Sequence, residues 1–133
     1  RKETKMPDVY IVQRPKMNKF GWVPDLTDAS RYGKLVPIFE DNDNPQFLPG
    51  PSIQKARRLM KDFNPEDFLL WPGGGDPTAV MIVSMIAGEI SPIVNVLRWE
   101  RNIEQGGRDR RIGWYMPLTL ELRKEANYGN KSA

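Results

Sequence analysis

One segment of the chain combines the residue types that bind polyanions. Arginine guanidinium groups neutralise phosphates, and aromatic faces stack on nucleic-acid bases. Residues of these types lie on or beside one predicted hairpin: Arg98, Trp99, Arg101, Arg108, Arg110, Arg111, Trp114 and Tyr115. The pattern predicts a nucleic-acid surface. Glu100, Glu104 and Asp109 are interleaved with the arginines, so the alternative is a solvated loop over an apolar strand pair.

A second basic group lies on a predicted helix over residues 53–63. Its apolar residues recur at helical spacing, and its other face carries Lys55, Arg57, Arg58 and Lys61. The nucleic-acid hypothesis requires Lys55, Arg58 and Lys61 to share one surface with the hairpin arginines. The alternative is a basic helix face that only contacts solvent.

A glycine loop between a predicted strand and a predicted helix is a weaker candidate, for phosphate. The backbone N–H groups of Gly73, Gly74 and Gly75 could face an anion at the helix N-terminus. Asp76 places a carboxylate there, Pro77 lacks an N–H, and no Lys-Ser/Thr pair follows. The alternative is a turn followed by an N-cap.

The sequence offers little catalytic chemistry. It contains no histidine and no cysteine, which removes the commonest general base, the commonest metal ligand and the thiol nucleophile. Ser52 and Lys55 match the S-x-x-K spacing of acyl-serine enzymes, but the companion motifs are absent, which favours a helix cap and a surface lysine. The acidic loop after residue 39 lacks a calcium-loop pattern. We therefore expect a non-enzyme with no catalytic residue, no metal and no cofactor.

The elements that position these residues follow from the apolar patterns. Strands are predicted over 8–13, 35–39, 67–71, 93–101 and 114–122, and helices over 27–32, 53–63 and 77–88. Pro37 indicates an edge position for its strand, and Pro117 indicates an edge or a bulge. In the last strand, Trp114, Met116, Leu118, Leu120 and Leu122 alternate, so Trp114 is expected to face the core. The helix over 77–88 has no polar face, so we expect it to be covered on most sides.

These elements predict one α/β domain over residues 1–133, with 1–7 and 124–133 as loose tails. The strand at 67–71, the helix at 77–88 and the strand at 93–101 form a βαβ unit with parallel strands. The last strand then runs antiparallel to the strand at 93–101, and the two form a C-terminal hairpin. The result is a mixed sheet of about five strands with helices packed on it. An α+β arrangement is the alternative fold class.

Several of the strings in this sequence resemble a pattern found in small phage-encoded proteins. They are Asp67-Phe68-Leu69-Leu70, Gly75-Asp76-Pro77 with its apolar helix, the run from Val96 to Arg101, and Tyr115-Met116-Pro117-Leu118. The pattern spans roughly residues 8–122, and the Trp-Pro-Gly-Gly segment before Gly75 departs from it. The resemblance implies a phage-encoded protein in the host cytoplasm, and no activity comes with it.

The sequence leaves three functions open. The first is a non-enzymatic protein that binds nucleic acid or a nucleic-acid-processing machine, which the net charge of +3 permits. The second is a protein–protein adaptor, inhibitor or assembly subunit that uses edge strands and long loops. The third is a small nucleotide or phosphate binder at the Gly73–Asp76 loop. No apolar run reaches the roughly 20 residues of a membrane span, so we expect no membrane partner.

Overall fold

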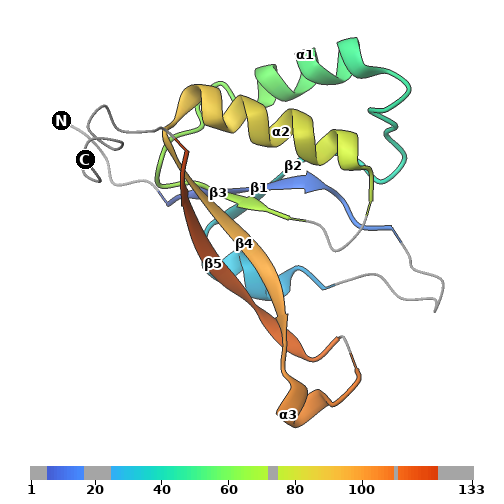
Figure 1. Ribbon diagram of the computed structural model, residues 1–133, viewed down its shortest axis with the longest axis vertical. Helices are drawn as coiled ribbons and strands as arrows, with labels where there is room; N and C mark the ends of the chain where they lie inside the picture. Colours follow the sequence, from blue (N-terminus) through green and yellow to red (C-terminus); the bar gives the residue numbers. More distant parts are fainter. Residues whose placement is uncertain (1–5, 17–24, 72–74, 110, 123–133) are drawn as a thin grey trace, which may run out of the picture.

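The computed structural model describes residues 6–16, 25–71, 75–109 and 111–122. In chain order the elements are β1 (Asp8–Gln13), the 3₁₀ helix η1 (Thr27–Arg31), β2 (Lys34–Phe39), α1 (Pro49–Leu59), β3 (Phe68–Leu70), α2 (Pro77–Ile90), β4 (Ile93–Arg101), α3 (Ile103–Gly106) and β5 (Gly113–Glu121). The strands form one sheet in the order β2-β1-β3-β4-β5 (Figure 1). The predicted tails lie almost entirely outside the described residues.

The sheet is mixed, as the sequence predicts. Strands β2, β1, β3 and β4 are mutually parallel, and β5 is antiparallel to β4. The fold class is therefore α/β, with β3, α2 and β4 as the βαβ unit and β4 and β5 as the C-terminal hairpin. Pro37 and Pro117 both lie in edge strands, where a missing N–H costs no ladder hydrogen bond.

The strand order decides which face each helix covers. The chain moves from β1 to β2 in one direction across the sheet and from β2 to β3 in the other. Because parallel crossovers are right-handed, this reversal puts η1 on one face and both α1 and α2 on the other. Two cores result. The larger lies under α1 and α2 and includes Tyr10, Met60 and Leu69, and the smaller lies under η1 and includes Ile11, Leu97 and Tyr115.

The predicted boundaries of the two long helices differ from the observed ones, and α1 ends at Leu59 rather than at Phe63. Helix α1 begins at Pro49 rather than after Ser52, because a proline at the first helical position has its φ already set for a helix. Helix α2 continues through Gly88 and ends at Ile90. A Cβ at Gly88 would lie 3.1 Å from Leu122 Cδ1, so this turn of α2 lies close to the end of β5.

The expectation that α2 is covered on most sides is also wrong. Its inner side packs into the larger core through Ile82, Val83 and Ile86. Its outer side is open, and the Met81 and Met85 side chains are each 60% exposed. In the part of the chain that the structure describes, no helix is long and apolar enough to cross a membrane.

Candidate functional site

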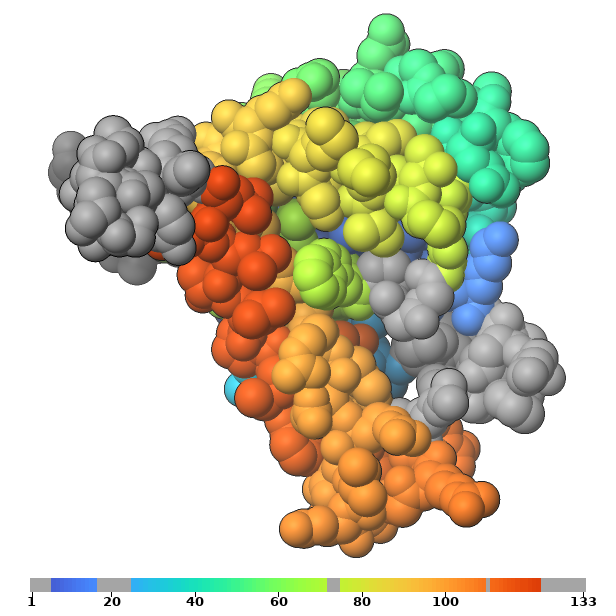
Figure 2. All heavy atoms as spheres, viewed as in Figure 1, coloured from blue at the N-terminus to red at the C-terminus, as the bar shows by residue number. Residues whose placement is uncertain are grey.

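The far end of the β4–β5 hairpin projects from the body of the protein. Beyond Leu97 and Pro117 the two strands continue as a twisted ribbon that ends in α3 (Figures 1 and 2). We call residues 98–116 the arm. At its tip, Asn102 Oδ1 accepts a hydrogen bond from Gln105 N (3.0 Å), and Asn102 N donates one to Ile112 O (2.8 Å). These bonds give the tip a defined turn.

The glycines at the tip serve this turn. A Cβ on Gly106 would lie 2.5 Å from Ile112 Cβ, so no larger residue fits there. Gly107 has φ +58° and ψ −118°, a conformation that residues with a Cβ avoid. Turn geometry thus accounts for both glycines.

Three side chains of the η1 region hold the backbone of the arm at Tyr115. Asp28 Oδ2 accepts a hydrogen bond from Tyr115 N (2.6 Å). Arg31 Nη2 (3.2 Å) and the Tyr32 hydroxyl (3.0 Å) donate to Tyr115 O. This η1 clamp fixes the base of the arm to the second face of the sheet. The sequence does not predict this clamp, because nothing in the short Thr27–Tyr32 segment indicates contact with a strand more than 80 residues away.

Tyr115 is therefore a core residue, which corrects its expected role in stacking. Its side chain is only 4% exposed and lies against Trp99 with ring centroids 4.9 Å apart. Burial, followed by the charges of Asp25 and Asp28, raises the pKa of Tyr115 to about 12. A ring enclosed in this way offers no face to a nucleic-acid base.

The alternating apolar residues of β5 share one face of the sheet, as expected, but most of them are exposed. Because Tyr115 faces η1, its neighbours in β5 face the side of the sheet on which α1 and α2 lie. Helix α2 lies over the inner strands and leaves most of β5 exposed. Leu120 packs against the larger core. Trp114 is half-buried, while Met116 (36%), Leu118 (38%) and Leu122 (51%) are exposed. We call these five residues the β5 apolar face.

The arginines of the arm divide into two groups. Arg98 pairs with Glu100 (2.6 Å), and Arg111 makes two hydrogen bonds to the Asp109 carboxylate (2.9 Å each). Those bonds lower the pKa of Asp109 to about 2. Arg101 and Arg108 are exposed and make no ion pair within the described ranges. Arg110 lies outside the described residues.

The basic residues of α1 and Lys61, which lies just beyond its end, do not join the arm. In Figure 1, α1 and the arm tip lie at opposite ends of the molecule. Lys55 pairs with Asp43 (2.9 Å), whereas Arg58 and Lys61 are exposed and without an ion pair among the described residues. One continuous positive surface made of both segments, as the nucleic-acid hypothesis requires, is absent from the described structure.

Gly75, the described residue of the glycine loop, lies close to Gln13 at the carboxyl end of β1, beside the reversal in strand order where open α/β sheets usually bind ligands. Gly73 and Gly74 lie outside the described residues, and Gly75 has φ +98°. Asp76 occupies the N-terminus of α2 with its own carboxylate, which accepts hydrogen bonds from Thr78 N (2.9 Å) and Gln46 N (3.1 Å). This arrangement disfavours an anion.

The neighbouring end of β1 is also filled by protein. The Gln13 side chain is buried, and its amide donates to Glu40 O (3.0 Å) and Asp43 O (2.9 Å). Among the described residues, no group of three or more carboxylates could hold a metal ion. The Lys55 ammonium group donates a hydrogen bond to Asp43 Oδ2. It is therefore not directed at Ser52, as the S-x-x-K motif of an acyl-serine enzyme would require.

These features define an α/β protein with a projecting β-ribbon, a candidate binding surface. A family model described as Phage Pam3 gp32-like protein matches residues 7–105, from the start of β1 into α3. The chain belongs to this phage protein family, and the resemblance predicted from its sequence is confirmed. No curated protein and no solved structure matches the chain.

The two buried tyrosines predict how stability depends on pH. Burial is the main cause that raises the pKa of both Tyr10 and Tyr115 from 10.0 to about 12. The folded state holds these protons more tightly than the unfolded state. The free energy of unfolding is therefore unaffected by them below about pH 10 and falls between about pH 10 and 12, by roughly 2–3 kcal/mol per tyrosine.

Urea unfolding between about pH 9 and 12 measures this fall in the free energy of unfolding. Tyr115→Phe should make it shallower, and an equally steep fall in this variant would contradict the assignment.

Proposed function

We propose that this phage protein is a non-enzymatic adaptor or assembly subunit that binds another protein through the β5 apolar face and the arm. The observation that carries the proposal is the exposure of Met116 and Leu118 on a strand whose apolar residues would otherwise face a core. Contiguous exposed apolar side chains on a folded domain are characteristic of interaction sites. The absence of histidine and cysteine from the sequence supports the non-enzymatic part.

The partner is expected to pack on the face of β5 rather than pair with its edge. The N–H and C=O groups of Tyr115 point away from β4 and already bond to the η1 clamp. Pro117, which is the next residue in the same phase, has no N–H to offer. Edge strands blocked in this way resist the addition of another strand. Side-chain packing against the apolar face is the contact that stays open.

The exposed arginines of the arm indicate that the partner carries negative charge. Arg101 and Arg108 are exposed near the tip, without ion pairs in the described part of the chain. Interfaces commonly combine an apolar centre rich in Met and aromatic residues with arginines and a polar rim. Arg101 is in phase with Trp99 and Tyr115, so it lies on the other face of the ribbon from Met116 and Leu118. The partner is therefore a protein whose apolar patch covers Met116 and Leu118 and whose carboxylates reach around the tip of the arm to the two arginines.

Substitution on the two faces of β5 tests this proposal. The full-length protein is used to capture its partner from phage-infected host cells, and the purified partner is then titrated with each variant. Met116→Glu and Leu118→Glu should each weaken binding by about 10-fold or more, because a charge enters a desolvated contact. Arg101→Glu should weaken binding most at low salt.

The matched control is Thr119→Glu, which places the same charge on the opposite face of the same strand. It should bind like the wild type, and all variants should unfold at similar urea concentrations. Wild-type affinity in Met116→Glu and Leu118→Glu, or the lack of any stoichiometric partner, would contradict the proposal.

A second candidate function rests on the same two arginines. The major groove of DNA admits a two-stranded β-ribbon, and the arm presents Arg101 and Arg108 on such a ribbon. The ion pairs of Arg98 and Arg111 and the burial of Tyr115 remove most of the other expected contacts. Nucleic acid therefore ranks behind a protein partner.

A salt titration with single- and double-stranded DNA tests this second function. If the arm binds phosphates, the double variant Arg101→Ala/Arg108→Ala should bind more weakly at every sequence. Its plot of log affinity against log salt should be less steep by about two units for a duplex. Lack of wild-type affinity at low salt, or a slope unchanged in the variant, would eliminate nucleic acid as the partner of the arm.

A further inference from the structure

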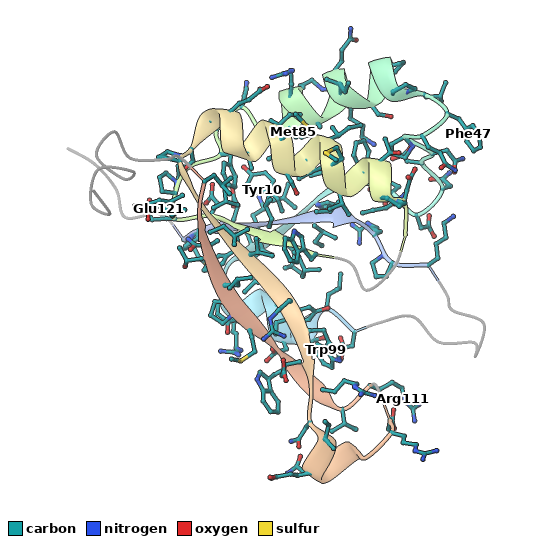
Figure 3. The ribbon with its side chains drawn as sticks, viewed as in Figure 1. Tyr10, Phe47, Met85, Trp99, Arg111 and Glu121 are labelled. Atoms are coloured by element: carbon teal, nitrogen blue, oxygen red, sulfur yellow. The ribbon has the colours of Figure 1, made fainter. Side chains whose placement is uncertain are left out.

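The outer side of α2 is an apolar ridge with charge only at its end. Pro77, Met81, Met85 and Glu89 follow one another at intervals of four residues and are all exposed. Such residues form a straight ridge along a helix. Met81 and Met85, in its middle, are each 60% exposed (Figure 3 labels Met85). No residue from Pro77 to Gly88 is charged. This ridge belongs to a helix, whereas the β5 apolar face and the arm belong to the hairpin.

We propose that the ridge binds a second copy of this chain, with the two α2 helices antiparallel about a two-fold axis. A two-fold axis brings the same patch of each copy together. If it passes beside the middle of the ridge, Met81 of each copy packs against Met85 of the other. The same register then places Pro77 of one copy beside Glu89 of the other. The four ridge positions are thus paired completely, and apolar residues meet in the centre.

The charges at the two ends of α2 favour this direction of packing. At the C-terminal end, Glu89 is bound by Arg57 through two hydrogen bonds (2.8 and 3.4 Å). At the N-terminal end lie the Asp76 carboxylate and the positive end of the helix dipole. Antiparallel packing brings the Arg57–Glu89 pair of one copy towards Asp76 and the positive end of the helix dipole of the other, so that the Arg57 guanidinium lies near both carboxylates. Parallel packing would instead place Glu89 against Glu89 and Asp76 against Asp76. The ridge is therefore complementary to itself in the antiparallel direction.

The length of the ridge sets the strength of the dimer. A helix of 14 residues is about 21 Å long. Two such helices bury less surface than the roughly 800 Å² per partner of a standard interface. The association should therefore be reversible, with a dissociation constant on the order of micromolar. It does not depend on the proposed function of the arm, because a different surface is involved.

Sedimentation of the full chain over a range of concentrations tests the dimer. The wild type should pass from monomer to dimer as its concentration rises through the micromolar range. Met81→Glu and Met85→Lys should each remain monomeric, since each places like charges into the contact of two identical copies. An equimolar mixture of the two variants should recover dimers, because position 81 of one copy faces position 85 of the other.

Leu118→Glu is the matched control, with an exposed apolar residue changed on the hairpin instead of on α2, and it should dimerise like the wild type. Circular dichroism verifies that the variants are folded. A wild type that remains monomeric at about 1 mM, or a Met81→Glu variant that dimerises as strongly as the wild type, would overturn the proposal. Recovery of dimers in the mixture supports direct packing of the two ridges, and its failure would overturn the proposed register.

Discussion

The hydrogen bonds between η1 and the backbone of Tyr115 determine how the C-terminal hairpin presents its side chains. Asp28 accepts from Tyr115 N, while Arg31 and Tyr32 donate to Tyr115 O, so this one residue of an edge strand is bonded on its outer side as a residue of a central strand would be. The bonds hold the Tyr115 side chain in the smaller core. Because side chains alternate along a strand, the neighbouring residues must then face the opposite side.

That opposite side is incompletely covered, and the reason lies in the order of the strands. The reversal at β1 sends both long helices to one face, where they lie over the inner strands and leave β5 at the rim. The other face receives only the five residues of η1. Apolar side chains therefore remain exposed on β5 and on the outer ridge of α2. Both proposed interfaces thus have a common origin in a five-stranded sheet that only two long helices, α1 and α2, cover.

Much of the fold could be predicted because apolar periodicity and proline positions are local signals. The five strands, the βαβ unit, and the edge positions of Pro37 and Pro117 all follow from them. The exposed side of α2 could not be predicted, because a helix with apolar residues on all sides has the same sequence pattern whether its outer side is buried or exposed to solvent. The phase of β5 depends on Tyr115, whose burial is due to a clamp formed by residues distant in sequence. The ion pairs of Arg98, Arg111 and Lys55 likewise depend on side-chain geometry. The number of basic residues in the sequence therefore overestimates the positive charge that the surface presents.

Amide hydrogen exchange in wild type and Asp28→Ala tests most directly whether the η1 clamp sets the phase of β5. Removal of the carboxylate leaves Tyr115 N without its acceptor, whereas the amides of Met116 and Leu118 keep their hydrogen bonds to β4. Exchange at Tyr115 should accelerate by about 10- to 100-fold, which corresponds to a loss of roughly 1–3 kcal/mol, with little change at the two neighbours. An unchanged rate at Tyr115, or an equal acceleration at all three amides, would contradict the account.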